Sequence, residues 1–335
     1  MQALNSSSAS WKLAFASSAI VVVVAALTTT WCKKAKKQRK SLQSSMRSVN
    51  YHFLRECNYG CNFCFHTDLK SEWVGLENAL EAIRLLKQAG CEKLNFSGGE
   101  PFLKPKDLGK MVKFAKKIGV KSVSIISNGS LIKEDWLDEN GSDLDILGIS
   151  CDSFKDSTNQ AHGRYKKGRG EAKDNAFKVA EWCAQRGIMF KLNTVVTSLN
   201  CNEDMKEGLR QLRAIGLQRW KVFQCLAIEG ENIGDNKTSR DVSDLGGNLL
   251  ITDAQFRAFL DLHAEFNPVF ESNELMRNSY VMLDEKCRFL NNQGGCKTPT
   301  KSILEVGVAA AFMEAGFEQE TFIKRGGLYA WSRSG

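Results

Sequence analysis

Few prolines and no low-complexity tract interrupt this sequence. Only 4 of its 335 residues are proline, while 43% are hydrophobic and 25% are charged, which is the composition of an ordinary globular protein. The sequence also lacks the cysteine pattern of a small secreted scaffold, because its 11 cysteines are odd in number and spread over a long chain. A disulfide framework is therefore disfavoured, and we expect most thiols to be free in a reducing compartment.

Acidic side chains are absent from the first 48 residues, which contain eight basic ones. The rest of the chain holds 38 basic and 38 acidic side chains, so the net charge of +8 belongs to this leader. A neutral body gives no support to DNA or RNA binding by the folded domain.

The leader contains an uncharged run of nineteen residues, 13–31, close to the length that an α-helix needs to cross a bilayer. Trp11 and Trp31 flank the run, and six basic residues follow it within 33–40. A cleaved signal peptide is disfavoured, since its charges would precede the apolar stretch. A spanning anchor with its basic side in the cytosol and a helix lying in the membrane interface both remain. Either one attaches the protein to a membrane through residues 11–40.

From residue 49 onwards, short β-rich runs alternate with amphipathic helical stretches. In the stretch 77–88, for example, apolar residues recur at spacings of three and four. Six such repeats predict an α/β protein with a parallel sheet and right-handed crossovers, in the form of a partial (β/α)6 barrel. The expected strands are 50–54, 93–96, 122–126, 144–150, 190–196 and 220–228.

Three segments follow from this pattern. Residues 1–48 form the membrane anchor and a basic linker, residues 49–230 form the barrel, and residues 231–335 form a less regular extension that closes the active site. By analogy with complete barrels, functional groups belong at the carboxyl ends of the strands.

Three cysteines stand within eight residues, directly after the first expected strand: Cys57, Cys61 and Cys64. Three thiols are one short of the four that close a simple iron–sulfur cluster or a structural zinc site. In a reactive cluster this deficit leaves one iron open to a ligand. A zinc site completed by His66 and a set of inert buried cysteines are the alternatives.

This Cys-x-x-x-Cys-x-x-Cys loop, placed after the first strand of a six-fold β/α protein, resembles that of the radical S-adenosylmethionine (SAM) superfamily. The resemblance implies a [4Fe–4S] cluster on the three cysteines, SAM chelated to its open iron, and a 5′-deoxyadenosyl radical formed on reduction. It also implies SAM contacts at the ends of the first four strands. The residues concerned are Phe63, Ser97, Gly98, Gly99, Glu100, Asn128 and Ser150. For the segments of Asn128 and Ser150, an ordinary turn without a cofactor contact is the alternative.

Polar and apolar residues alternate on three of the expected strands. Side chains two apart in a strand share a face, so Lys93 and Asn95 lie opposite Leu94 and Phe96. The apolar face belongs against the helices, and the polar face then points into the barrel. Buried cations are costly unless an anion meets them, and a polyphosphate suits Lys and Arg donors, whereas solvated strand ends are the alternative. The inward set is Lys93, Asn95, Lys191, Asn193, Arg219 and Lys221.

Segments throughout the body, such as 220–225 and 228–232, resemble one family within that superfamily, the viperins. This resemblance implies conversion of CTP to 3′-deoxy-3′,4′-didehydro-CTP (ddhCTP), an antiviral chain terminator, by hydrogen abstraction from ribose C4′ and loss of the 3′-hydroxyl as water. It assigns the inward set to the nucleotide, Arg164 and Lys297 to further phosphate contacts, and Tyr280 to late hydrogen donation. A packed aromatic with a satisfied hydroxyl is the alternative for Tyr280.

The resemblance also implies partners and a location. It predicts the cytosolic face of the endoplasmic reticulum membrane or lipid droplets, a reductase, and cluster delivery by the cytosolic iron–sulfur assembly machinery. Members of the family commonly end in an acidic, aromatic-terminated tail that receives the cluster, whereas the sequence given ends at Gly335 without one. The mode of delivery therefore stays open.

Two rival functions remain. Other radical SAM reactions usually need auxiliary clusters, for which Cys287 and Cys296 are the only cysteines beyond residue 225. A membrane scaffold without enzymatic activity would tolerate the loss of Cys61, whereas an enzyme would not.

Overall fold

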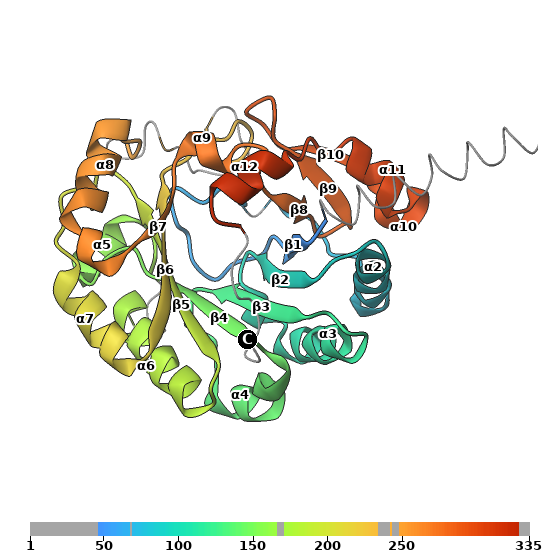
Figure 1. Cartoon of the computed structure of the whole chain (residues 1–335), viewed down its shortest axis with the longest axis horizontal. Helices are drawn as coiled ribbons and strands as arrows, with labels where there is room; N and C mark the ends of the chain where they lie inside the picture. Colours follow the sequence, from blue (N-terminus) through green and yellow to red (C-terminus); the bar gives the residue numbers. More distant parts are fainter. Residues whose placement is uncertain (1–45, 68, 166–170, 234–241, 243–247, 328–335) are drawn as a thin grey trace, which may run out of the picture. The chain divides into compact units, whose positions relative to one another are not determined.

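Six parallel strands joined by helices form the centre of the computed structural model (Figure 1). The structure describes residues 46–67, 69–165, 171–233, 242 and 248–327. Residues 1–45, which hold the predicted membrane anchor, lie outside this part of the chain. Within the described residues, no helix is long and apolar enough to cross a membrane.

The strands pair in the order β10-β9-β8-β1-β2-β3-β4-β5-β6-β7, so the sheet is open and its centre follows the chain order. The pairs from β1 to β6 are all parallel, which confirms the predicted α/β architecture with a parallel sheet. The bounds are β1 Ser48–Leu54, β2 Lys93–Gly98, β3 Ser122–Ser127, β4 Ile146–Ser150, β5 Met189–Val196, β6 Leu217–Gln224, β7 Val269–Glu271, β8 Val281–Leu283, β9 Arg288–Asn291 and β10 Thr298–Ser302.

Amphipathic helices cover the outer side of the curved strands, as Figure 1 shows for α2, α3, α6 and α7. In α2 the buried positions include Ile83 and Leu86, which lie on the face predicted from the apolar spacing. The helices are α2 Leu76–Gln88, α3 Pro105–Lys117, α4 Glu134–Asn140, α5 Asp156–Ala161, α6 Ala172–Gln185, α7 Lys206–Ile215, α8 Asp253–Leu262, α9 Asn273–Met276, α10 Ile303–Val306, α11 Val308–Met313 and α12 Gln319–Lys324.

The apolar side chains of the central strands pack against these helices. Leu94, Phe96 and Leu192 are no more than 1% exposed, and Trp220 and Val222 are also buried. None of the five lines the cavity on the inner side of the sheet. Each fully buried side chain of this kind contributes roughly 1.5–3 kcal/mol to folding, so the alternation along the strands fixes which face points inwards.

The sixth strand ends earlier than the sequence pattern predicts. It stops at Gln224, four residues before the expected end, and a turn follows in which the Asn232 N–H donates to the Ile228 carbonyl at 3.1 Å. The backbone N–H of Ile228 donates to the Asn232 side chain at 2.7 Å, and the Asn232 side chain donates to the carbonyls of Phe63 and Leu226. The turn therefore brings the segment after β6 against the loop that carries the three cysteines.

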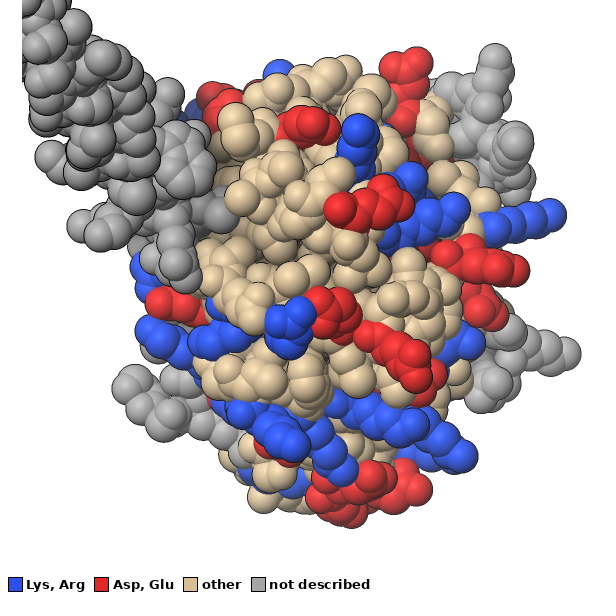
Figure 2. Space-filling model, turned by 90° about the vertical axis from the view of Figure 1, so that its right-hand side faces the viewer, with Lys and Arg blue, Asp and Glu red and all other residues tan. Residues whose placement is uncertain are grey.

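The outer surface of the described part of the chain carries charges of both signs. Figure 2 shows Lys and Arg interspersed with Asp and Glu on the face that α2 and α3 cover. Several of these residues form ion pairs, such as Lys113 with Glu139 at 3.1 Å and Lys121 with Glu92 at 3.0 Å. Exposed pairs of this kind contribute little to stability, but they leave no single-signed field over this face.

Candidate active site

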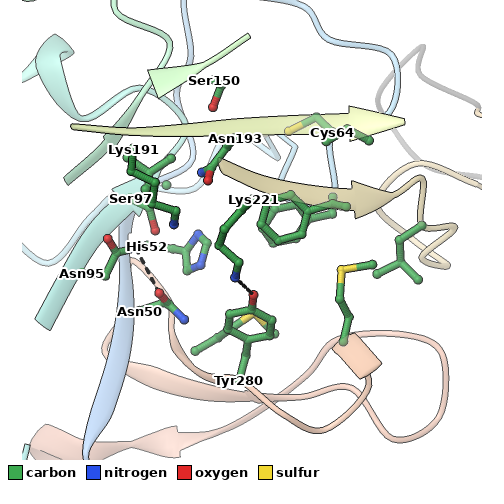
Figure 3. Close-up of a pocket in the computed structure, with 18 of the residues that line it drawn as sticks. Asn50, His52, Cys64, Asn95, Ser97, Ser150, Lys191, Asn193, Lys221 and Tyr280 are labelled. Atoms are coloured by element: carbon green, nitrogen blue, oxygen red, sulfur yellow. Dashed lines mark hydrogen bonds between the residues drawn. The ribbon is translucent and has the colours of Figure 1, made fainter. Parts of the chain in front are cut away.

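A cavity of about 320 Å³ lies on the inner side of the sheet, and all six central strands contribute to it (Figure 3). The strand register aligns its polar side chains in rows. Asn193 of β5 lies opposite Lys221 of β6, and Asn50 of β1 lies opposite Asn95 of β2. The predicted inward residues all line this cavity: Lys93, Asn95, Lys191, Asn193, Arg219 and Lys221.

The three cysteines of the loop after β1 line the same cavity. Cys57, Cys61 and Cys64 are free and of intermediate exposure. Burial raises the pKa of Cys57, and Glu100 and Cys61 raise it further, so its thiolate needs a cationic partner such as a metal. Among the residues that the structure describes, no three His, Cys, Asp or Glu side chains already stand in a metal-binding arrangement.

The donor set nevertheless fits an iron–sulfur cluster better than zinc. Three thiols converge on one cavity that also offers polar groups for a further ligand, as an open iron requires. His66, the fourth ligand in the zinc alternative, is 2% exposed and does not line the cavity. Its Nδ1 lies 3.2 Å from the Lys297 ammonium instead.

Two glycines at the end of β2 hold the segment that leads into the cysteine loop. A Cβ at Gly98 would overlap the Leu54 carbonyl, and one at Gly99 would overlap the Glu56 carbonyl. This close approach lets the Gly99 N–H donate to Leu54 at 2.7 Å and the Glu100 N–H donate to Glu56 at 2.9 Å. Only glycine permits such contact, and at Gly98 φ is also +141°.

Glu100 is fully buried and does not line the cavity. Its carboxylate accepts from the N–H groups of Phe102 at 3.0 Å and Asn128 at 2.8 Å, and from the Ser127 hydroxyl at 2.7 Å. Burial raises the pKa of Glu100, and these donors oppose the shift. Asn128 lines the cavity and donates to the Asn58 side chain in the cysteine loop at 2.8 Å. Glu100 thus fixes the ends of β2 and β3, and its contact with SAM stays a prediction.

The other predicted SAM residues all line the cavity. They include Phe63, above whose ring the Arg164 guanidinium lies at 5.5 Å from the centroid. Burial alone would lower the pKa of Arg164, but its ion pair with Asp152 and the nearby Cys61 raise it. Arg164 is therefore a permanent cation beside Phe63 of the cysteine loop and lines the same cavity, and its predicted contact with phosphate stays a prediction. Ser97, Gly98, Gly99 and Ser150 line the cavity as well.

Cations outnumber carboxylates where β2, β5 and β6 line the cavity. Glu271 at the end of β7 forms buried ion pairs with Lys221 and with Arg325, the latter at 3.0 Å. Burial together with the neighbouring cations lowers the pKa of Lys93 and Lys191 well below the ordinary value. The pKa of Lys221 falls to about 8, chiefly through burial. A polyanion bound here would relieve this repulsion. We call Lys93, Lys191, Arg219, Lys221 and Arg325 the basic group.

Tyr280 reaches the cavity between members of the basic group. The Lys221 ammonium donates to its hydroxyl at 2.9 Å (Figure 3), and that hydroxyl in turn donates to Glu271. The Arg325 guanidinium lies over the ring, 3.7 Å from its centroid. The phenol therefore has a proton acceptor in direct contact, and its predicted hydrogen donation stays a prediction.

The sequence pattern also contained cavity residues that we did not single out. Asn50 and His52 of β1 alternate as the polar residues of β2 do, and both line the cavity. Asn95 donates to Asn50 at 2.9 Å and accepts from Ser124 at 2.7 Å. Burial lowers the pKa of His52 to about 3, so a neutral imidazole faces the cavity. The period of two in β1 could have revealed it.

Lys297 lies apart from the basic group. It is not among the residues that line the cavity. Its ammonium donates to the Phe65 carbonyl and forms a buried ion pair with Glu231 at 3.2 Å. Its predicted contact with phosphate stays a prediction.

Comparison with known proteins bears on both the fold and the site. The sequence model of the radical SAM superfamily matches residues 51–242. A relative from Siniperca chuatsi, named S-adenosylmethionine-dependent nucleotide dehydratase RSAD2, is 50% identical over 291 residues, which cover 86% of this chain and 80% of that protein. A relative of the same name from Oncorhynchus mykiss is 48% identical, with 86% and 81% covered.

A solved structure shares the fold at low sequence identity. The crystal structure of Streptococcus suis SuiB bound to S-adenosylmethionine superposes with a TM-score of 0.64 at 14% identity. The match covers 87% of this chain and 71% of SuiB.

Proposed function

Since the chain belongs to the radical SAM superfamily and, within it, to the S-adenosylmethionine-dependent nucleotide dehydratases of the viperin (RSAD2) family, we propose that it dehydrates CTP to ddhCTP. One observation carries the proposal: a single cavity joins three free thiols to the basic group. The thiols of Cys57, Cys61 and Cys64 would hold the [4Fe–4S] cluster. When bound, the cluster and SAM supply abstraction of hydrogen from an unreactive C–H bond. The protein's own part is to bind, orient and shield the nucleotide.

The basic group binds the triphosphate. Its members come from β2, β5, β6 and the segment after α12, so they meet an extended anion from several sides. Charge-assisted hydrogen bonds to phosphate are stronger than neutral ones. The bound triphosphate also attracts the cations of the basic group, which repel one another in its absence. The rows of Asn50, Asn95 and Asn193 lie next to the lysines and offer amide groups to the ribose or base.

Tyr280 completes the reaction. Loss of a hydrogen atom from C4′ and of the 3′-hydroxyl as hydroxide leaves a species one electron short of ddhCTP. The phenol supplies that electron and releases its proton to Glu271, to which it is already hydrogen-bonded. A proton taken up by the hydroxide gives water, and an external reductase restores the tyrosine. Tyr280→Phe should therefore lower kcat far more than it changes KM.

The proposal extends to the parts of the chain that surround the barrel. The segment 231–335 closes the active site, and Phe322 and Arg325 on the cavity wall support this. Residues 11–40 attach the enzyme to the cytosolic face of the endoplasmic reticulum or to lipid droplets, where it serves antiviral innate defence. Cytosolic iron–sulfur assembly proteins load the cluster. Flotation with lipid vesicles, lost when residues 1–45 are removed, tests the attachment.

The function is tested with the full chain, reconstituted anaerobically with iron and sulfide and reduced with dithionite. SAM is offered with CTP, UTP, GTP or ATP, and 5′-deoxyadenosine and the nucleotide masses are read together. We expect CTP to stimulate 5′-deoxyadenosine release and to lose the mass of one water. Release that no nucleotide stimulates would contradict the assigned substrate but not the superfamily.

A further inference from the structure

Four buried charged residues lie behind the cysteine loop, and of these only Lys297 has a role predicted above, a contact with phosphate. Arg55 pairs with Glu231 at 3.1 Å and with Glu285 at 3.3 Å, and Lys297 pairs with Glu231 at 3.2 Å. Their side chains are at most 7% exposed, and none of them lines the cavity. We call these four residues the buried charge cluster. Such a cluster is costly to assemble in a protein interior, because each charge loses its hydration.

The buried charge cluster forms hydrogen bonds to the backbone directly after the last cysteine. The Lys297 ammonium donates to the Phe65 carbonyl. Glu231 accepts from the Thr67 N–H at 2.8 Å and from its hydroxyl at 2.9 Å, and Arg55 donates to the Thr67 carbonyl at 3.0 Å. These contacts join residues up to 232 positions apart in the chain. They fix the C-terminal side of the cysteine loop from outside the cavity.

The buried charge cluster also lies close to Cys64, the last cysteine of the loop. Burial lowers the pKa of Lys297, whereas Glu231 and Cys64 act in the opposite direction. The Lys297 ammonium donates a hydrogen bond to the carbonyl of Phe65, the residue next to Cys64. Two cations and two carboxylates balance within the cluster, so removal of one partner leaves a net charge close to the thiol. Charges in such surroundings are poorly screened.

We propose that Lys297 and Glu231 are positioning residues for the iron–sulfur cluster and set its reduction potential with opposite sign. Reduction adds one negative charge to the iron–sulfur cluster, which the Lys297 ammonium stabilises and the Glu231 carboxylate destabilises. The reduction potential of such a cluster depends on the net charge around it and on the contacts of its ligands. The inference rests on the cluster at Cys57, Cys61 and Cys64 and not on the identity of the nucleotide.

The test is a potentiometric titration of the reconstituted full chain, followed by electron paramagnetic resonance. Lys297→Met should shift the midpoint to more negative potential and Glu231→Gln to more positive potential. We expect each shift to be about tenfold in the reduction equilibrium, or about 59 mV for a one-electron couple. The double variant should return towards the wild type. Lys297→Arg and the exposed Lys301→Met serve as controls and should not shift.

Opposite signs distinguish electrostatic tuning from damage to the loop, because damage would move both variants in the same direction. Shifts of equal sign, or none despite an intact spectrum, would overturn the proposal. If a variant binds no iron–sulfur cluster, amide hydrogen exchange of the iron-free full chain tests the positioning role instead. Glu231→Gln should accelerate exchange at Thr67, whose N–H it holds, and unchanged exchange would refute the positioning role. A wild-type chain that binds no cluster would instead refute the assignment on which the inference rests.

Discussion

Replacing Lys191 with methionine should separate the stability of the free protein from its affinity for the nucleotide. Lys191 lines the cavity from β5. Glu271 forms its ion pairs with Lys221 and Arg325, and no ion pair found within the described residues includes Lys191. Burial and the nearby Lys221 and Lys93 lower its pKa well below the ordinary value. The ammonium is therefore unfavourable in the free protein and favourable once an anion is bound.

The two free energies change in opposite directions. Burial of a polar group without compensation costs roughly 1–3 kcal/mol in proteins, so Lys191→Met should raise the free energy of unfolding by about 1 kcal/mol or more. A hydrogen bond to a charged group contributes roughly 1.5–3 kcal/mol, so the Kd for CTP should increase by about 10- to 150-fold. Since the folded pKa lies below its ordinary value of 10.5, the stability gain should be full at pH values below the folded pKa of Lys191 and should vanish as the pH approaches 10.5.

Urea unfolding and calorimetry with CTP measure the two quantities on the same full-length variant. Lys110→Met is the matched control, because Lys110 lies exposed on α3 and should change neither quantity beyond about 0.5 kcal/mol. A variant at Lys191 that loses stability and keeps its affinity would refute the reasoning. That result would instead favour the alternative interpretation from the sequence, in which Lys191 lies at a solvated strand end.

Gly99→Ala directs a methyl group onto the Glu56 carbonyl, so the free energy of unfolding measured with urea should fall by about 1–3 kcal/mol. Gly60→Ala is the control, because nothing lies within 4 Å of a Cβ at that position. It should lower the free energy of unfolding by less than about 0.5 kcal/mol. Because burial lowers the pKa of Lys221 to about 8, calorimetric affinity for CTP should fall as the pH rises through 8. Cys61→Ser should reduce the iron retained after reconstitution by roughly tenfold or more. Equal losses at both glycines, pH-independent affinity or full iron content would contradict these expectations.

The inner face of the sheet could be predicted because it depends on a local pattern. In a strand, side chains alternate between two faces, so Lys93 and Asn95 had to share the face opposite Leu94 and Phe96. The same reasoning holds for β5 and β6. The short helices α4 and α5 were not predicted, since seven and six residues hold too few apolar positions to show a helical period.

The rest of the site depends on contacts between distant segments. Glu271 and Arg325 meet only because β7 joins β6 and the segment after α12 returns to the cavity. No local pattern announces such a pair. Lys297 differs, because the sequence did predict a role for it. The resemblance suggested a phosphate contact for this residue but could not predict where its side chain lies. In the structure its ammonium binds Glu231 behind the cysteine loop.

The most direct test of the central claim is isotope transfer from the nucleotide. Full-length enzyme, reconstituted and reduced, is incubated with SAM and CTP deuterated at C4′, and the mass of the 5′-deoxyadenosine formed is measured. CTP deuterated at C3′ is the control. The account predicts that 5′-deoxyadenosine gains one mass unit only from the C4′-labelled nucleotide and that ddhCTP accumulates with it. Unlabelled 5′-deoxyadenosine, with CTP recovered unchanged, would contradict the assignment of CTP as the substrate.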